Sequence, residues 1–371
     1  MTPEQRLLPP LVFIHGIKGS VLTDSRGGVR WIDWEQAFGL CTPDLSLPLR
    51  WNGEVQQHDD LVAGAPLRAV AWHDIYAPFL DWASASGQAF RPFAYDWRRD
   101  NLESATEFIK LLENVSQKHG GARIQVVAHS MGGLITFVAL NRRPDLFHSV
   151  LFAGVPFGHN ISFLEDMHCG IAIGLNTTIL SPQVLFTFAS PYSLFPWNTR
   201  DSGLVEVNGH GIPHNWYSAE DWERHKLGIF AAIGQDRVTD DQRGHLQNAL
   251  RQALDFRCIL VCKAEKSFQY PPLAVLASKT RPTLTTVVRG GPHAIRGWDF
   301  RSAAKKLGDG RVEFSAALPP RGVPYEIYTT MRDHGGLLNN THQIAAILAK
   351  LGERNSSFLG RLPVPSRDGR T

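Results

Sequence analysis

The 371-residue sequence contains only four cysteines, Cys41, Cys169, Cys258 and Cys262, and none of them forms a C-x-x-C pair. So few thiols do not build a disulfide framework, and we interpret them as free cysteines. The sequence also lacks an H-E-x-x-H motif and a cluster of histidines. It therefore predicts no metal site and no cofactor.

Long apolar runs are missing as well. No window reaches roughly 18 uncharged apolar residues, the length that a transmembrane helix needs. The segment from Met1 to Leu11 lacks the apolar run of a secretory signal, because Arg6 and two prolines interrupt it. The sequence therefore predicts a soluble, cytoplasmic protein.

Charge of one sign is not concentrated anywhere in the chain. The net charge is +3, and the Lys and Arg residues are scattered, without the like-charged block that a nucleic-acid footprint requires. We therefore expect no nucleic-acid partner. With 43% hydrophobic residues, the chain is long enough for one large α/β domain with an insertion or for two ordinary domains.

Short apolar runs, closed by glycine or by polar turns, recur along the sequence. Runs of this kind are typical of strands that are buried on both faces of a parallel sheet. Strands are expected at residues 11–14, 123–128, 150–153, 227–233 and 325–330. Helices are expected at residues 105–115, where apolar positions are spaced i, i+3, i+4 and i+7, and at 134–140. This alternation predicts an α/β fold with a mostly parallel, doubly wound sheet.

Residues 157–226 break that alternation. They are rich in Phe, Trp, Pro and Asn and contain no alternating pattern long enough for a sheet. We expect this segment to form a cap inserted into a single domain that covers residues 1–351. The polar residues 352–371 are expected to form a flexible C-terminal tail.

The most informative motif is Ala128-His129-Ser130-Met131-Gly132, which lies between an expected buried strand and an expected apolar helix. This is the setting of a G-x-S-x-G type elbow, in which a tight turn holds the serine hydroxyl out over the end of the sheet. Small residues are needed at Ala128 and Gly132, because larger side chains would collide with neighbouring segments. The motif predicts Ser130 as a nucleophile rather than as an ordinary helix N-cap.

A nucleophilic serine requires hydrogen-bond donors for the oxyanion that develops on the substrate. In this arrangement one donor is a main-chain N–H from the loop after the first strand, here residues 15–20 (H-G-I-K-G-S), and the second is the residue after the nucleophile. We therefore predict an oxyanion hole formed by the amides of Ile17 and Met131.

The serine hydroxyl also needs a general base oriented by a carboxylate, in the chain order serine, acid, histidine. His334 follows the last expected strand and is the predicted base, with His342 as the alternative. Asp236 in G-Q-D-R-V and Asp309 in G-D-G-R-V both lie on loops between Ser130 and His334. Spacing alone leaves both open as the acid.

Together, these motifs resemble those of the lecithin:cholesterol acyltransferase family, which includes lysosomal phospholipases and phospholipid:diacylglycerol acyltransferases. Residues 95–98 (Y-D-W-R) and 128–133 (A-H-S-M-G-G) match family motifs letter for letter. Residues 15–20 are similar to its P-G-x-x-G-S loop, with His15 in place of proline, and residues 190–196 to its S-x-Y-x-L-L-P. The resemblance covers the chain up to the tail and implies an α/β-hydrolase fold.

The resemblance also implies roles for particular residues. The family's acid lies in G-D-G-T-V, which selects Asp309, with Arg311 in place of threonine. The family has a lid segment that contains tryptophan, so residues 20–50 are expected to form a lid-like loop. Its Trp31 and Trp34 either contact an acyl chain or belong to the hydrophobic core, and the sequence leaves both alternatives open. Asp96 and Arg98 are expected to be structural.

These residues predict a serine-dependent acyl-ester hydrolase or O-acyltransferase that forms an acyl-enzyme on Ser130. The resemblance implies a lipid-like ester as substrate, together with transient contact with a membrane or lipid surface. Two alternatives stand beside this prediction. One is a carboxylesterase that acts on non-lipid esters, and the other is a catalytically inactive binding protein that keeps the fold.

Overall fold

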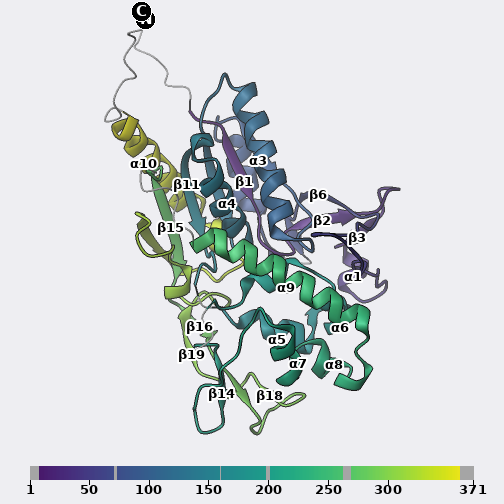
Figure 1. Ribbon diagram of the computed structural model, residues 1–371. Coiled ribbons are helices and arrows are strands. Elements are labelled where there is room, and N and C mark those ends of the chain that lie inside the picture. Colours follow the sequence, from purple (N-terminus) through teal and green to yellow (C-terminus); the bar gives the residue numbers. More distant parts are fainter. Residues whose placement is uncertain (1–7, 71–72, 159, 198–200, 262–268, 360–371) are drawn as a thin grey trace, which may run out of the picture.

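The computed structural model describes residues 8–70, 73–158, 160–197, 201–261 and 269–359. Within this part of the chain, six parallel strands form a central sheet in the order β20-β15-β11-β10-β1-β9 (Figure 1). The strands are β1 Leu11–Ile14, β9 Phe90–Phe93, β10 Ile124–His129, β11 Phe147–Ala153, β15 Leu273–Ser278 and β20 Glu326–Thr330. The chain runs from β1 to β9 on one side and from β10 outward on the other. A doubly wound sheet of this kind binds ligands at its switch point, here between β1 and β10.

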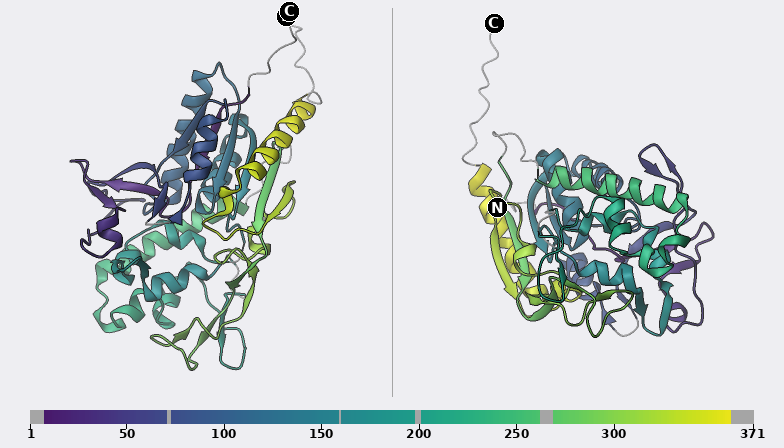
Figure 2. Two further views of the ribbon diagram at one scale, coloured as in Figure 1. Left: turned by 180° about the vertical axis from the view of Figure 1, so that it is seen from behind. Right: turned by 60° about the horizontal axis from the view of Figure 1, so that its bottom comes forward.

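Helices cover both faces of the sheet (Figures 1 and 2). Val12 and Ile14 belong to a hydrophobic cluster with α3 Asn101–Lys118 and α4 Met131–Arg142 on one face. Leu11 and Phe13 belong to a second cluster with α2 Ala77–Ala85 and α10 Thr341–Leu359 on the other face. Alternate side chains of a strand point to opposite faces, and for that reason β1 is a continuous apolar run.

The helix that precedes β10 shows how local sequence sets these elements. Asp100 is the N-cap of α3, and its carboxylate accepts hydrogen bonds from the amides of Leu102 and Glu103. Phe108, Leu112 and Val115 form its buried face, as the apolar spacing predicts.

Residues between β11 and β15 contribute no strand to the central sheet in the part of the chain that the structure describes. The predicted cap segment, 157–226, lies in this region. The long helix α9 packs against α3 and α4, and the shorter helices lie below the sheet in Figure 1. The helices of this region are α5 Ser162–Cys169, α6 Pro182–Phe186, α7 Ala219–Arg224, α8 Ile229–Ala232 and α9 Asp240–Val261, with the 3-10 turns η2 Ser190–Leu194 and η3 Gln235–Arg237.

The strand predicted at residues 227–233 is wrong, because this run contains helix α8. Gly228 precedes the helix with a φ of 53°, and the helix packs against α5 and α6 instead of pairing with a strand. A short apolar run is compatible with either state, so its neighbours in the fold decide. The strand that completes the sheet at this point of the chain is β15, in the buried run L-A-V-L-A-S.

Smaller sheets and turns surround the carboxyl ends of the central strands. The predicted lid-like loop contains β2, β3 and α1, and β2 pairs with β3 and β6 in an antiparallel sheet. The remaining elements are β2 Ser20–Thr23, β3 Val29–Trp31, α1 Trp34–Ala37, β4 Trp51–Asn52, β5 Val55–Gln56, β6 Val62–Pro66, β7 Ala69–Val70, β8 His73–Asp74, η1 Pro144–Leu146, β12 Ile171–Ile173, β13 Asn176–Leu180, β14 Leu204–Glu206, β16 Arg281–Leu284, β17 Val287–Arg289, β18 Trp298–Asp299, β19 Lys305–Gly308, η4 Ser315–Ala317 and η5 Leu337–Asn339.

The C-terminal helix extends further than expected. α10 continues to Leu359, into the segment predicted as a flexible tail, and residues 360–371 lie outside the described residues. Ile344, Ile347, Leu348 and Leu351 anchor the earlier turns of this helix in the second hydrophobic cluster. None of the helices in the described ranges is long and apolar enough to span a bilayer.

Candidate active site

Ser130 occupies a sharp turn between β10 and α4. Its backbone has φ 53° and ψ −128°, a conformation that a residue with a side chain rarely adopts. Two main-chain hydrogen bonds hold the turn: the Ser130 amide donates to the Ala153 carbonyl at 2.9 Å, and the Gly133 amide donates to the Ser130 carbonyl at 2.9 Å. The turn therefore has the geometry expected of a nucleophile elbow.

The glycines around Ser130 allow three segments to pack closely. A Cβ atom at Gly132 would overlap the carbonyl oxygen of His15, and one at Gly133 would overlap the side chain of Val155. A Cβ at Gly16, in the loop after β1, would lie 2.7 Å from the Cβ of Ser130. These close approaches explain the requirement for glycine and bring the loop after β1 against the elbow.

His334 lies on the loop between β20 and η5 and points toward Ser130. Its Nε2 is 2.9 Å from the Ser130 Oγ, and its Nδ1 is 2.8 Å from Oδ2 of Asp309. The carboxylate accepts the hydrogen of Nδ1, which leaves the lone pair of Nε2 to accept the serine hydroxyl. The structure thus joins the predicted serine, histidine and aspartate in one hydrogen-bonded chain.

Asp309 follows β19 and is only 2% exposed. Its Oδ1 accepts the amides of Arg311 and Val312 at 2.9 and 2.7 Å. Burial is the largest single influence and would raise the pKa of this carboxyl, but the charge and hydrogen bonds of His334, together with the amide donors, outweigh it. The pKa of Asp309 is therefore held below its usual value, and the carboxyl is ionised at neutral pH.

The two alternatives that the sequence left open lie elsewhere. Asp236 is exposed in the 3-10 turn η3, and His342 is exposed near the start of α10. Neither is among the hydrogen-bond partners of Ser130, Asp309 or His334 within the described residues.

Arg311 occupies the position where the related family has threonine. Its guanidinium pairs with Asp166 of α5, with Nη1 at 3.2 Å from Oδ1, and its carbonyl accepts the Ser162 hydroxyl at 2.7 Å. The replacement therefore anchors the loop that carries Asp309 to the first helix after β11.

Gly154, directly after β11, is a residue whose importance the sequence did not reveal. It has a φ of 58°, and a Cβ there would overlap Leu337 and lie 3.0 Å from Asp309 Oδ2 and 3.1 Å from His334 Nδ1. Only glycine leaves room for the acid and the base at this point. The signal in the sequence is the Gly-Val-Pro at 154–156, which is loosely similar to a G-T-P motif of the lecithin:cholesterol acyltransferase family.

The predicted oxyanion donors lie next to the elbow: Met131 follows Ser130 in the chain, and Ile17 follows Gly16, where an added Cβ would lie 3.2 Å from Ser130 Oγ. Gly16 to Gly19 form a turn closed by a 3.1 Å hydrogen bond from the Gly19 amide to the Gly16 carbonyl, with Lys18 at φ 65°. Within the described residues, the amides of Ile17 and Met131 have no hydrogen-bond acceptor. Unpaired main-chain N–H groups are rare in proteins, and two of them beside a nucleophile can hold an anionic oxygen.

The two lid tryptophans lie in different environments. Trp31 is 2% exposed, packs edge-to-face on Trp97 and donates its indole N–H to the Lys18 carbonyl at 3.2 Å. Trp34 is 62% exposed at the start of α1. Contact of either side chain with an acyl chain stays a prediction, and the hydrogen bond of Trp31 to Lys18 joins it to the loop that carries Ile17.

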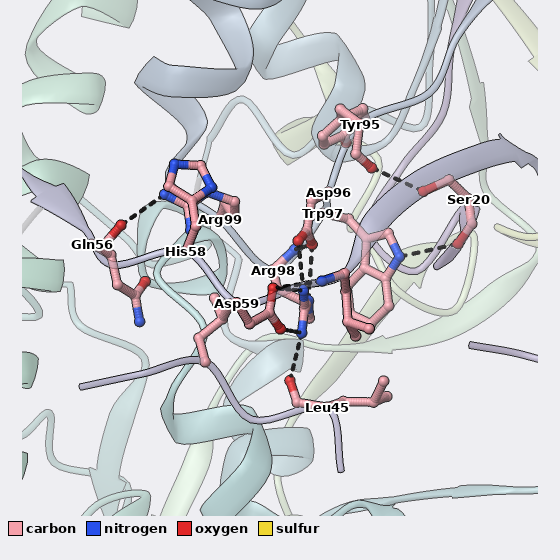
Figure 3. A network of polar contacts seen from close by, with 12 residues as sticks. Ser20, Leu45, Gln56, His58, Asp59, Tyr95, Asp96, Trp97, Arg98 and Arg99 are labelled. Carbon is pink, nitrogen blue, oxygen red and sulfur yellow. Dashed lines mark hydrogen bonds and ion pairs between the residues drawn. The ribbon is translucent and has the colours of Figure 1, made fainter. Parts of the chain in front are cut away.

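Figure 3 shows how the Y-D-W-R motif ties the lid-like loop to the sheet. Arg98 is completely buried, and its guanidinium donates to the carboxylates of Asp96 and Asp59 and, at 2.9 Å, to the carbonyl of Leu45. The indole of Trp97 donates to the carbonyl of Ser20 at 3.2 Å. The motif anchors residues 20–59 beside the site. Asp96 and Arg98 therefore have contacts that fit the structural role expected from the sequence.

No group of three or more His, Cys, Asp or Glu side chains in the described parts of the chain is arranged to hold a metal ion.

Comparison with known proteins identifies the family and the fold. The family model described as alpha/beta hydrolase family matches residues 61–330. The chain belongs to the alpha/beta hydrolase family. The chain is similar in fold to the protein in the crystal structure of the Tle4-Tli4 complex, with a TM-score of 0.57 at 13% identity over 94% of this chain and 98% of that chain. The predicted fold class is thus confirmed.

Curated relatives also resemble this chain. Uncharacterized protein YJR098C of Saccharomyces cerevisiae is 25% identical over 230 residues, 61% of this chain and 34% of that protein. Lecithin-cholesterol acyltransferase-like 4 of Arabidopsis thaliana is 32% identical over 170 residues, 38% of this chain and 32% of that protein. Lysosomal phospholipase A and acyltransferase of Canis lupus familiaris is 32% identical over 95 residues, 24% of this chain and 23% of that protein. The predicted resemblance to the lecithin:cholesterol acyltransferase family is confirmed. The chain spans about a third or less of the length of each of these relatives.

Proposed function

We propose that this hydrolase transfers acyl groups from lipid-like esters through a covalent acyl-enzyme on Ser130. The observation that carries the proposal is the hydrogen-bonded chain from Ser130 through His334 to Asp309, centred on the strained turn at Ser130. A serine hydroxyl becomes a useful nucleophile only beside a base, and this base is oriented by a buried carboxylate.

In the first step, Ser130 Oγ attacks the ester carbonyl carbon while its proton moves to Nε2 of His334. The carbonyl oxygen becomes an oxyanion and accepts hydrogen bonds from the amides of Ile17 and Met131. Each such donor lowers the barrier by roughly 3 to 4 kcal/mol. Asp309 stabilises the imidazolium that has formed. When the ester C–O bond breaks, the imidazolium returns its proton to the departing alkoxide, and the acyl group remains on Ser130.

In the second step, a new acceptor attacks the acyl-enzyme with His334 again as the base. With water as acceptor the product is a free acid, and with an alcohol the product is a new ester. Either acceptor loses its proton to Nε2, and the same proton then restores the Ser130 hydroxyl. We propose hydrolysis as the principal reaction and O-acyl transfer as a second capacity of the same site.

Two observations favour a lipid-like substrate. Relatives of the chain are named lecithin-cholesterol acyltransferase-like 4 and lysosomal phospholipase A and acyltransferase. In addition, large apolar side chains are exposed where α1 meets the β12–β13 hairpin, whose Leu175 amide donates to the Ala37 carbonyl at 2.8 Å. These side chains are Trp34, Phe38, Leu40 and Leu175, which are 62%, 40%, 71% and 72% exposed. An apolar patch of this kind fits transient contact with a lipid surface.

A fluorophosphonate probe tests the nucleophile. The folded wild-type protein is expected to react covalently, and Ser130→Ala is expected to lose the reaction. Ser104→Ala is the matched control, because Ser104 is a buried serine on α3 that donates to the Asp100 carbonyl, and it is expected to react normally. Folded wild-type protein that does not react would favour the binding-protein alternative.

The substrate class needs a separate assay. Hydrolysis of nitrophenyl esters of increasing acyl length and of phospholipid vesicles is measured with and without a long-chain alcohol. Preference for long acyl chains and for vesicles supports the lipid assignment, and formation of an alkyl ester establishes acyl transfer. Preference for short acyl chains would contradict the lipid assignment and leave a carboxylesterase.

A further inference from the structure

Two buried side chains lie directly behind the triad and take no part in the proposed chemistry. Tyr76 precedes α2 and is 3% exposed, and His129 is the last residue of β10 and is 4% exposed. The Tyr76 hydroxyl lies 2.8 Å from Nδ1 of His129 and accepts the Gly16 amide at 3.1 Å. Nε2 of His129 lies 2.9 Å from the carbonyl oxygen of His334.

The directions of these hydrogen bonds follow from the acceptors. A carbonyl oxygen can only accept, so the hydrogen of the His129 ring lies on Nε2 and is donated to the His334 carbonyl. Nδ1 then carries a lone pair, which accepts the hydroxyl hydrogen of Tyr76. The same hydroxyl oxygen accepts the N–H of Gly16. One placement of the hydrogens therefore gives a hydrogen-bond partner to the Tyr76 hydroxyl, to both ring nitrogens of His129 and to the Gly16 amide.

Burial keeps these directions constant over the pH range in which such enzymes work. Burial, with a smaller contribution from the nearby His334, lowers the pKa of His129 to about 3. Burial also raises the pKa of Tyr76 well above its usual value. A neutral imidazole and a neutral phenol keep their protonation states near neutral pH, so the directions of these hydrogen bonds stay the same.

We infer that Tyr76 and His129 are positioning residues. They fix the loop after β1, which carries the donor Ile17, relative to the loop after β20, which carries the base His334. The hydrogen bonds run from Gly16, next to the donor Ile17, through both side chains to the main chain of His334. They join loops that follow β1, β10 and β20 at the carboxyl edge of the sheet. This inference rests on the proposed function, because it assigns the two residues to the same reaction.

Removing the Tyr76 hydroxyl would leave the Gly16 amide and His129 Nδ1 without this partner. The ring itself would stay in place, because it packs against Phe13 at a centroid distance of 5.0 Å. Tyr76→Phe is therefore expected to fold. The loop after β1 and the loop after β20 are expected to lose the hydrogen bonds that connect them. Loss of one oxyanion donor lowers kcat by roughly 10²- to 10³-fold, so a misplaced donor is expected to cost about 10- to 100-fold.

The experiment compares Tyr76→Phe with the wild type and with Tyr270→Phe. Tyr270 donates its hydroxyl to Asn141 at the far end of α4 and serves as the matched control. For each protein, kcat and KM for a nitrophenyl ester are measured, together with the affinity for a trifluoromethyl ketone, which forms an oxyanion on the enzyme. His129→Gln supplies a second test, since the amide nitrogen of glutamine can occupy the place of Nε2 and donate to the His334 carbonyl.

Tyr76→Phe is expected to lower kcat and trifluoromethyl ketone affinity by similar factors while KM stays within about twofold, and Tyr270→Phe is expected to change none of them. His129→Gln is expected to lose less activity than His129→Ala, because it restores one of the two bonds. A folded Tyr76→Phe protein with wild-type kcat and ketone affinity overturns the inference. If Tyr76→Phe does not fold, equal activity of His129→Ala and the wild type overturns it. Persistence of activity in Ser130→Ala would instead refute the proposed function.

Discussion

Replacement of Gly154 by alanine tests how closely the backbone after β11 packs against the acid and the base. Residue 154 has a φ of 58°, and this conformation costs roughly 1 to 2 kcal/mol for a residue with a side chain. The added methyl group also overlaps Leu337 and lies about 3 Å from the carboxylate of Asp309 and the imidazole of His334. Overpacking of a buried site adds about 1 to 3 kcal/mol. The expected loss of stability is therefore about 2 to 5 kcal/mol.

Gly154→Ala is also expected to have a lower kcat at temperatures where it is fully folded, an effect that its loss of stability does not explain. Because the methyl group pushes on the groups that activate Ser130, a displacement of about 1 Å would lower kcat by about 100-fold. Gly87 offers a matched control, with a φ of 79° and no described atom within 4 Å of an added Cβ. Gly87→Ala is expected to lose only about 1 to 2 kcal/mol, with an unchanged kcat.

The assay combines urea unfolding with steady-state hydrolysis of a nitrophenyl ester at a temperature where both variants are folded. The difference between the two variants isolates the contact at Gly154 from the cost of the backbone conformation. Equal stability and equal kcat in Gly154→Ala and Gly87→Ala would refute the packing that we describe around Asp309 and His334.

Three further predictions concern the acid, the buried histidines and the anchored loop. Asp309→Asn is expected to lower kcat by about 10⁴-fold with little change in KM, because the imidazole of His334 loses its orientation. A decrease in kcat below tenfold, measured by steady-state kinetics, would contradict Asp309 as the acid. Burial lowers the pKa of His15 and His129 to about 4 and about 3, so their contribution to stability is present above about pH 6.5 and is lost as the pH falls toward 4. The free energy of unfolding, measured by urea titration at pH 7, 5.5 and 4, should therefore decline by up to about 1.4 kcal/mol per pH unit for each group, and a constant free energy would contradict this account. Arg98→Ala leaves the carboxylate of Asp59 without its buried partner and is expected to lower the free energy of unfolding by about 3 to 5 kcal/mol in the same assay. A decrease below about 1 kcal/mol would contradict the anchoring role of Arg98.

The elements around Ser130 could be predicted from the sequence because their signals are local. The strand before Ser130 is buried on both faces and mostly apolar, with Val126, Val127 and Ala128 in succession, and α4 begins directly after the turn. The helix α3 shows its buried face in the spacing of Phe108, Leu112 and Val115. In each case a few neighbouring residues specify the element, and the fold does not override them.

Other features depend on contacts between distant segments. The run at 227–233 becomes a helix because it packs among cap helices, and nothing within seven apolar and small residues distinguishes that outcome from a strand. The choice of Asp309 over Asp236 needed a family pattern, since both lie on glycine-containing loops. Tyr76 had no motif at all, because its hydrogen bond to His129 joins residues 53 positions apart.

The most direct test of the central claim is to identify the residue that carries the acyl group. Enzyme quenched with acid during turnover of a long-chain nitrophenyl ester is digested and analysed by mass spectrometry. We predict an added acyl mass on the peptide that contains Ser130, and its absence from Ser130→Ala together with a loss of at least about 10⁴-fold in turnover. An acyl group on another residue, or wild-type turnover by Ser130→Ala, would contradict the account.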